Sequence, residues 1–225
     1  MATILENVQG VKARIARAAR ASGRDPESVT LLAVSKTHAA TRIAEARAAG
    51  LHAFGENYVQ EALQKMQSVP GVEWHLIGAL QSNKSRLAAE RFDWVQTVDR
   101  VKIANRLSEQ RPAHLQPLNV LIEVNISGEA AKSGVAVKEV TELAAAVGRL
   151  PRLRLRGLMA IPAAGAVGDF AKMRRLYEEL GGRFGFDTLS MGMSGDMDEA
   201  IAAGATMVRI GTAIFGARKP QETAA

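Results

Sequence analysis

The sequence contains no cysteine, so disulfide bonds, thiolate nucleophiles and thiolate metal sites are excluded. No two of its four histidines have the spacing of a metal-binding pair on one helical turn, and we expect no metal site. There is no run of about eighteen apolar residues, so no membrane-spanning helix is expected. The absence of cysteine also fits a cytoplasmic protein in a reducing environment.

Aromatic residues are scarce, with two Trp, two Tyr and six Phe among 225 residues. The net charge of +6 attracts phosphates, nucleic acids and anionic membranes alike, but surfaces that bind single-stranded nucleic acid usually interleave basic and aromatic side chains. The densest basic cluster alternates with leucine and is interpreted as the solvated start of a strand: Arg149, Arg152, Arg154 and Arg156. We expect no nucleic-acid or membrane partner, and a cofactor-free interaction module is the least favoured hypothesis.

The chain shows no Pro/Gly/Ser-rich linker, which predicts a single domain over residues 1–225. Residues 1–20 carry four basic side chains without an apolar signal core, so they are interpreted as an amphipathic helix; an organelle transit peptide is the minor alternative. Beyond them, apolar β-rich runs alternate with helix-like segments, which predicts a parallel sheet. The predicted strands are 30–34, 52–54, 74–77, 94–97, 120–125, 156–161, 188–191 and 207–210, and the predicted helices are 41–49, 57–67, 83–91, 100–110, 137–148, 166–182 and 196–203.

Eight strands at this spacing predict an α/β fold: a single (β/α)8 TIM barrel with an additional N-terminal helix. An open doubly wound sheet is the alternative, but no G-x-G-x-x-G follows the first strand, which ends in Val34-Ser35-Lys36. Active sites of such barrels lie at the C-terminal ends of the strands, and phosphate groups often bind in the loops after strands 7 and 8. The candidate functional residues are therefore expected at these ends.

Lys36 follows the first strand, where its amine would point into the barrel mouth. Partial burial would favour the neutral amine, the form that attacks an aldehyde to give an imine. Taken alone, this feature is better explained by a lysine whose ammonium simply reaches solvent.

The loops after the seventh and eighth predicted strands carry a second set of candidates. Ser194 and Gly195 are expected just before a helix, offering a hydroxyl and backbone N–H groups to an anion, while Gly211 and Thr212 allow close approach and add another hydroxyl. An N-cap and a tight turn are the structural alternatives. Together with Lys36, these loops suggest an aldehyde phosphate that is held at both ends.

Three further positions stand near the same strand ends. Arg209 shares a strand face with Gly211 and could reach a cofactor ring nitrogen, with an ion pair to Glu123 as the alternative. Asn57 is expected to open a helix, so capping explains it as well as ligand contact does. His75 is interpreted as a satisfied interior histidine. Lys84 and Lys132 are rivals to Lys36 or secondary acceptors.

Seven stretches, in order along nearly the whole chain, resemble the pyridoxal phosphate (PLP) homeostasis proteins, also called the proline-synthetase co-transcribed family. They are LLAVSKTH (31–38), FGENYVQEAL (54–63), WHLIGALQSNK (74–84), VQTVDR (95–100), VLIEVNISGEAAKSG (120–134), RGLMAI (156–161) and LSMGMSGDMDEAIAAGATMVRIGTAIFGAR (189–218). The resemblance implies a barrel like the N-terminal domain of alanine racemase.

For the site, the resemblance implies PLP as cofactor, a Schiff base on Lys36, a phosphate held by Ser194, Gly211 and Thr212, Arg209 at the ring nitrogen and Asn57 near the cofactor. It implies a protein without robust catalysis that buffers PLP and delivers it to partners, the apo-forms of PLP enzymes. Nothing in the sequence indicates an obligate dimer, so we expect a monomer. A weak amino-acid racemase is the alternative. It would need a second base from Tyr58 or His75, since we expect no room for the C-terminal domain that supplies a tyrosine in alanine racemases.

Overall fold

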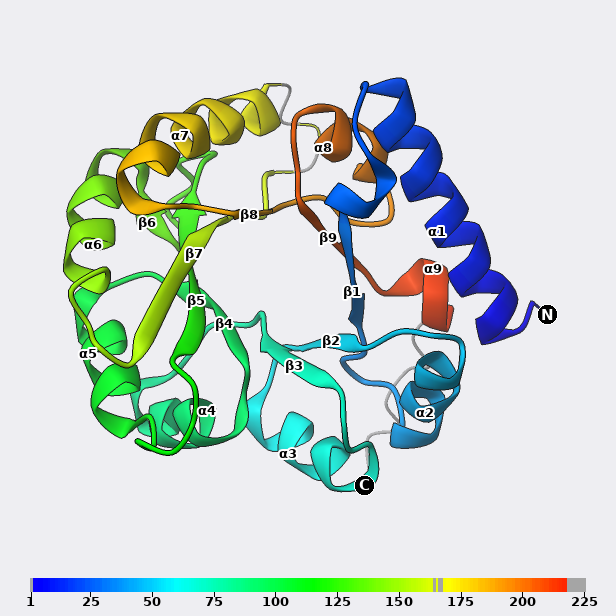
Figure 1. Ribbon diagram of the computed structural model, residues 1–225, viewed down its shortest axis with the longest axis horizontal. Helices are drawn as coiled ribbons and strands as arrows, with labels where there is room; N and C mark the ends of the chain where they lie inside the picture. Colours follow the sequence, from blue (N-terminus) through cyan, green and yellow to red (C-terminus); the bar gives the residue numbers. More distant parts are fainter. Residues whose placement is uncertain (1, 164, 166–167, 218–225) are drawn as a thin grey trace.

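Eight parallel strands close into a barrel in the computed structural model, which describes residues 2–163, 165 and 168–217 (Figure 1). Neighbouring strands pair in the order β4-β3-β2-β1-β9-β8-β7-β5, and pairing of β4 with β5 closes the ring. These strands are β1 (Thr30–Val34), β2 (Ala53–Glu56), β3 (Glu73–Leu76), β4 (Trp94–Val98), β5 (Leu118–Asn125), β7 (Leu153–Met159), β8 (Thr188–Ser190) and β9 (Met207–Ile210).

The predicted (β/α)8 barrel is confirmed, with every predicted strand overlapping an observed one. The boundaries differ: β7 begins three residues before the predicted 156, because Leu153 and Arg154 still pair with β5. A further strand, β6 (Val135–Ala136), was not predicted. It pairs only with the end of β5, and two residues are too short to show an alternating pattern.

Helices form the outer ring around the barrel (Figure 1). Those in the described residues are α1 (Ile4–Ala21), α2 (Ala40–Ala48), α3 (Val59–Ser68), α4 (Ser85–Arg91), α5 (Val101–Gln110), α6 (Val140–Val147), α7 (Asp169–Phe184), α8 (Met197–Ala202) and α9 (Thr212–Phe215), with 3-10 turns at Pro26–Ser28, Ser82–Lys84 and Val137–Glu139. The predicted helix 166–182 corresponds to α7, and its residues 166–167 lie outside the described part. None of the described helices is long and apolar enough to cross a membrane.

The additional N-terminal helix is α1, which lies beside α8 and α9 (Figure 1). Its buried residues recur at helical spacing and form one apolar stripe: Ile4, Val8, Val11, Ile15 and Ala19. The helix begins with a capping box, in which the Thr3 hydroxyl accepts from the Glu6 N–H at 3.2 Å and Glu6 Oε2 accepts from the Thr3 N–H at 2.7 Å.

We predict that Thr3→Ala lowers the free energy of unfolding by about 1 kcal/mol, because one N–H at the start of the helix loses its capping acceptor. Urea unfolding of the variant measures this loss. The control is Thr41→Ala on the exposed face of α2, which removes no capping bond and improves helix propensity. Equal midpoints for the wild type and Thr3→Ala would show that the cap contributes nothing.

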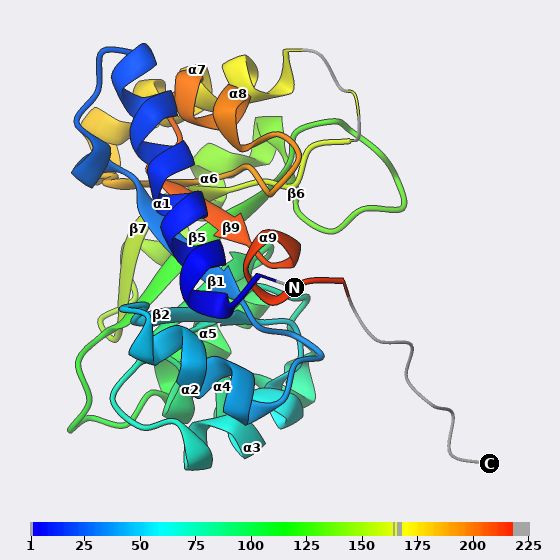
Figure 2. The same cartoon turned by 90° about the vertical axis from the view of Figure 1, so that its right-hand side faces the viewer.

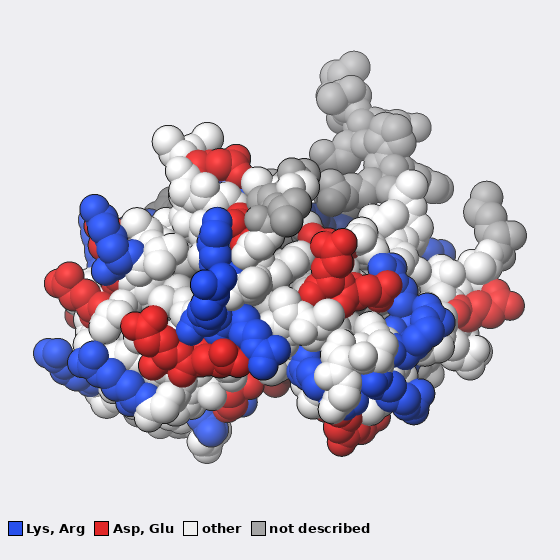
Figure 3. Space-filling model, turned by 90° about the horizontal axis from the view of Figure 1, so that it is seen from above, with Lys and Arg blue, Asp and Glu red and all other residues white. Residues whose placement is uncertain are grey.

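The segments that follow β5 and β7 project from the same end of the barrel as α9 (Figure 2). This end of the barrel is the C-terminal end of its strands. On the face shown in Figure 3, Lys and Arg are interspersed with Asp and Glu, and no large area carries one sign of charge.

Candidate functional site

A pocket of about 260 Å³ opens at the C-terminal end of the barrel strands. All the side chains and glycines selected from the sequence as cofactor contacts line it: Lys36, Asn57, Ser194, Gly195, Arg209, Gly211 and Thr212. The sequence reasoning missed the rest of the wall, which is Val34, His38, Ile77, Ile161 and Met193. Each of these residues lies at the C-terminal end of a strand or a few residues beyond it. They could have been predicted, because active sites of such barrels lie at these strand ends.

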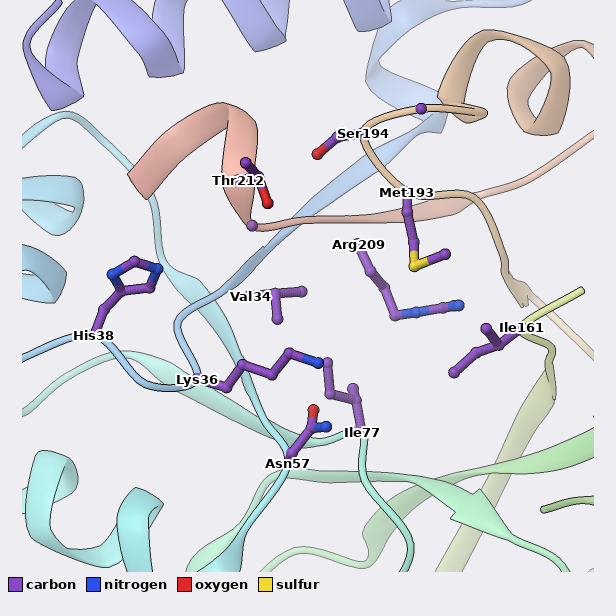
Figure 4. A pocket seen from close by; sticks show the side chains of 12 residues that line it. Val34, Lys36, His38, Asn57, Ile77, Ile161, Met193, Ser194, Arg209 and Thr212 are labelled. Atoms are coloured by element: carbon purple, nitrogen blue, oxygen red, sulfur yellow. The ribbon is translucent and has the colours of Figure 1, made fainter. Parts of the chain in front are cut away.

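Lys36 lies two residues after β1, and its side chain runs across the pocket above Asn57 (Figure 4). The Arg209 side chain extends toward the middle of the pocket from another part of its wall (Figure 4). The next residue, Thr37, has a φ of 67°, the only positive φ among the non-glycine residues that the structure describes. This conformation is costly for a β-branched side chain, so surrounding contacts must hold the turn.

A buried ion-pair cluster holds that turn. The Lys65 ammonium donates to the Ser35 carbonyl at 2.8 Å, to Glu56 Oε1 at 2.7 Å and to Glu61 Oε1 at 2.6 Å. Ser35 Oγ also donates to Glu56 Oε1, and Glu61 Oε1 accepts from the Thr37 N–H. The residues on both sides of Lys36 are therefore fixed to one cluster, which sets the direction of the Lys36 backbone.

Glu56 is the least satisfied member of this cluster. It is fully buried, and its Oε2 atom has no hydrogen-bond partner among the described residues. Burial raises the pKa of Glu56 above its ordinary value, although the Lys65 ammonium opposes this rise. The carboxyl thus depends on Lys65 to remain charged.

Ser194 and Gly195 lie in the loop after β8, and Thr212 is the first residue of α9, which follows β9 and Gly211 directly. Ser194 and Thr212 face the same part of the pocket (Figure 4). The helix expected directly after Gly195 begins later: α8 starts at Met197 with Asp196 at its N-cap position, and Asp196 Oδ1 accepts from the Met193 N–H at 2.6 Å. Ser194 is therefore not the N-cap. Among the described residues, neither its hydroxyl nor that of Thr212 makes a hydrogen bond, and the N–H groups of Ser194, Gly195 and Thr212 have no acceptor.

Gly192 shapes the first of these loops. Its φ is 91°, and a Cβ at this position would lie 2.4 Å from the Ala200 Cβ of α8. Its carbonyl accepts from the Arg209 N–H at 3.0 Å, which ties the loop to β9. Only glycine permits both the backbone conformation and the close packing on α8.

Arg209 is buried, and its guanidinium donates to Ser190 Oγ and to the Ala160 carbonyl, both at 2.8 Å. The expected alternative, an ion pair with Glu123, is wrong: no such pair within 4.0 Å exists in the described part, and the two groups interact only at longer range. Burial lowers the pKa of Arg209 to about 10, which leaves the group charged at neutral pH. A guanidinium carries five N–H donors, so donors remain for a ligand.

A hydrogen-bond chain through the barrel interior holds Arg209 in place. Ser190 Oγ donates to Gln96 Oε1 at 2.7 Å, Gln96 Nε2 lies 2.9 Å from His75 Nδ1, and His75 Nε2 lies 2.7 Å from Glu73 Oε1. His75 is fully buried, and burial lowers its pKa. Both ring nitrogens are thus occupied, as expected for an interior histidine, and His75 does not line the pocket.

Asn57 reaches the pocket from the turn after β2. The prediction that it opens the following helix is wrong, because α3 begins at Val59 and Tyr58 occupies the N-cap position. The side chain is left facing the pocket (Figure 4). Gly78 makes room for this turn, since a Cβ there would lie 2.3 Å from the Asn57 carbonyl oxygen.

The two rival lysines lie elsewhere. Lys84 ends the 3-10 turn Ser82–Lys84 and does not line the pocket of Lys36. Lys132 lines a neighbouring pocket of about 250 Å³, which shares Asn57, Ile77 and Ile161 with the first. Its ammonium pairs with Glu129 Oε1 at 2.8 Å.

Glu123, on β5, also lines the neighbouring pocket. Only 8% of the residue is exposed, and its carboxyl makes no hydrogen bond or ion pair with any other described residue. Burial, and to a lesser extent Asp99, raise the pKa of Glu123 to about 7, while Arg209 opposes the rise.

This shift predicts a pH-dependent stability. A carboxyl with a pKa near 7 in the folded chain and about 4.3 in the unfolded chain binds more proton when folded, so stability falls as the pH rises between these values. We expect Glu123→Gln to remove this fall and to be more stable than the wild type at pH 8 by roughly 1–3 kcal/mol. Urea unfolding at about pH 5 and 8 measures the difference, and an equal pH slope in both proteins would contradict it.

The arrangement as a whole matches a known class of barrel. The model for the family "Alanine racemase, N-terminal domain" matches residues 7–219. The alanine racemase of Corynebacterium glutamicum shares the fold, with a TM-score of 0.70 over 97% of this chain and 62% of its own, at 18% identity.

Closer relatives define the family within this class. The chain belongs to the pyridoxal phosphate homeostasis proteins. It is 58% identical to the family member of Pseudomonas aeruginosa over 97% of each chain. It is also 58% identical to that of Escherichia coli K12, over 97% of this chain and 98% of the relative. PipY of Synechococcus elongatus, solved with PLP bound, is 34% identical with a TM-score of 0.81, covering 95% of this chain and all of its own.

Proposed function

We propose that this protein binds PLP as a Schiff base on Lys36 and serves intracellular PLP homeostasis by keeping the cofactor bound yet deliverable to apo-enzymes. The observation that carries the proposal is one pocket lined by the Lys36 amine and by hydroxyl and N–H donors of Ser194, Gly195 and Thr212 that have no acceptor among the described residues. The PLP-bound relative supports it. As proposed, the protein acts as a cytoplasmic monomer.

The residues present fit the cofactor. The unpaired donors of Ser194, Gly195 and Thr212 suit a phosphate, and a Cβ built on Gly195 meets nothing within 4 Å, so that backbone is open to a ligand. Asn57 lies beside Lys36 (Figure 4). When bound, PLP supplies an aldehyde that a lysine amine holds reversibly.

Arg209 argues for storage rather than catalysis. Its guanidinium stays protonated and can only donate to the ring nitrogen of the cofactor, which opposes protonation of that nitrogen and weakens the ring as an electron sink. Ser190 and Ala160 fix its direction.

The alternative of a weak amino-acid racemase lacks its second base at the expected positions. His75 has both nitrogens occupied outside the pocket, and Tyr58 is 65% exposed at the start of α3 and does not line the pocket. α-Proton exchange with free amino acids, measured in heavy water, would favour the racemase if it depended on Lys36.

Loading and delivery test the proposal together. We expect the wild type to become yellow with PLP and, after removal of free cofactor, to restore the activity of an apo-form of a PLP enzyme. A protein that remains colourless with saturating PLP would overturn the proposal. One that turns yellow but never activates an apo-enzyme would remove the delivery role.

We predict that Thr212→Val weakens PLP binding about tenfold, equivalent to about 1.4 kcal/mol, because one hydroxyl donor to the phosphate is lost while the side-chain shape is kept. The matched ligand is pyridoxal, which lacks the phosphate. Titration followed by absorbance should show that the ratio of PLP to pyridoxal affinity falls. An unchanged ratio would place the phosphate elsewhere.

A further inference from the structure

The neighbouring pocket contains an acidic group that no part of the PLP site uses. Glu123 lies on the same face of β5 as Leu121, which packs inside the barrel against Trp94 and Met159, so its carboxyl points into the barrel mouth. It is more than nine-tenths buried and has no hydrogen-bond or ion-pair partner in the described part of the chain. Buried carboxyls normally have such a partner, and this one faces a cavity instead.

The charges around Glu123 favour a cation. Asp99, directly after β4, acts on Glu123 as a like charge, and Arg209 is the opposing cation on the side of the PLP pocket. Asp99 is already paired with Arg100 at 2.6 Å, whereas Glu123 has no such partner in the described part, so a bound cation would supply the counter-charge that Glu123 lacks. Lys132 lines the same cavity; its ammonium is paired with Glu129 and keeps further protons for an anionic group.

We propose that this pocket is a subsite for a free α-amino acid, with Glu123 receiving its ammonium group and Lys132 meeting its carboxylate. The volume of about 250 Å³ admits a small zwitterion, and side chains of both charges line the cavity. Because Asn57, Ile77 and Ile161 line both pockets, the amino group enters next to the pocket of Lys36.

Glu123 gives the subsite a chemical task as well as a binding one. A proton passes from the ammonium to the Glu123 carboxylate, which leaves a neutral amine and a neutral carboxylic acid. The pKa of Glu123, near 7, lets the carboxyl take this proton and return it to water at neutral pH. The neutral amine can then replace Lys36 on the aldehyde carbon of the cofactor: a carbon–nitrogen double bond to the amino acid forms, the one to Lys36 breaks, and the two protons of the incoming amine pass to the Lys36 nitrogen, which leaves as a free amine. The inference therefore rests on the proposed function, and it adds a signal for release of the cofactor, namely the level of free amino acid.

The test uses the full-length protein without cofactor, a state in which PipY has also been solved. Backbone amide resonances near the cavity, those of Glu123, Asn125 and Ser133, are followed by NMR during titration with L-alanine, with methylamine and with propionate. We expect L-alanine to bind most tightly, methylamine to shift the Glu123 resonance more weakly, and propionate to leave that resonance unmoved. Glu123→Gln should weaken L-alanine binding at least about tenfold, or 1.4 kcal/mol.

The matched control is Glu109→Gln, which changes an exposed carboxylate on α5 that has no ion pair with any described residue, and it should bind L-alanine as the wild type does. Undiminished binding by Glu123→Gln, or equal shifts of the Glu123 resonance with propionate, would overturn the subsite. If Glu123→Gln does not fold, the three ligands on the wild type still decide. Failure of amino-acid binding in a wild type that loads with PLP refutes the subsite alone, whereas failure to load with PLP refutes the proposed function.

Discussion

Replacing Lys36 with alanine is expected to abolish the yellow Schiff-base absorbance and to weaken PLP binding by on the order of a hundredfold, or about 3 kcal/mol. The variant keeps the donors of Ser194, Gly195 and Thr212, so the phosphate can still dock. It loses the only amine among the described residues that line this pocket. Absorbance titration gives the first effect, and equilibrium dialysis gives the second.

The change should not disturb the fold, because the Lys36 side chain is only half-buried and the turn is held through its neighbours, Ser35 and Thr37. Lys84→Ala is the control that removes a lysine near the same barrel end, and it should retain the absorbance band. If Lys36→Ala became as yellow as the wild type, another lysine would carry the cofactor.

Lys65→Met is expected to lower the free energy of unfolding by about 3–5 kcal/mol, because it leaves the buried Glu56 carboxylate without its counter-charge. For a chain of this length that corresponds to a fall in Tm of roughly 10 °C. The same substitution removes the hydrogen bonds from Lys65 to the Ser35 carbonyl and to the Glu61 carboxylate, so the turn that carries Lys36 is held less firmly. Schiff-base formation should slow accordingly, measured by stopped-flow absorbance below the new Tm.

Lys102→Met, an exposed lysine on α5, is the matched control and should change neither Tm nor rate. Adding Glu56→Gln to Lys65→Met should recover part of the stability, because the stranded charge is removed. If the double variant regains stability but still forms the Schiff base slowly, Lys65 positions Lys36 in addition to stabilising the fold. A Lys65→Met protein as stable and as fast as the wild type would contradict both roles.

Strand ends were the most predictable feature of this protein. The alternation of strands and helices predicts the barrel. Because active sites of such barrels lie at the C-terminal strand ends, the sequence also indicates Lys36, Ser194 and Thr212, and all three line one pocket. Helix starts were less predictable: Asn57 and Ser194 have good N-cap side chains, yet both helices begin later. At these two positions the N-cap propensity of the side chain competes with backbone packing, since Gly78 packs against Asn57 and Gly192 packs against Ala200 of α8.

Contacts between distant elements could not be predicted. Lys65 looks like an ordinary cation on an amphipathic helix until α3 is laid on the barrel, where it meets the Ser35 carbonyl thirty positions earlier. Glu123 was considered only as a partner for Arg209, because the sequence cannot show that Ser190 and Ala160 take that place. The unpartnered carboxyl becomes visible only once the mouth of the barrel is assembled.

The most direct test of the central claim is borohydride reduction of the PLP-loaded protein, followed by mass mapping of its peptides. Reduction converts the Schiff base to a stable secondary amine and marks the lysine that carried it. We predict the mark on the peptide containing Lys36. A mark on Lys84 or Lys132 in its place would contradict the assignment of the residue, and the absence of any marked lysine would contradict the cofactor site itself.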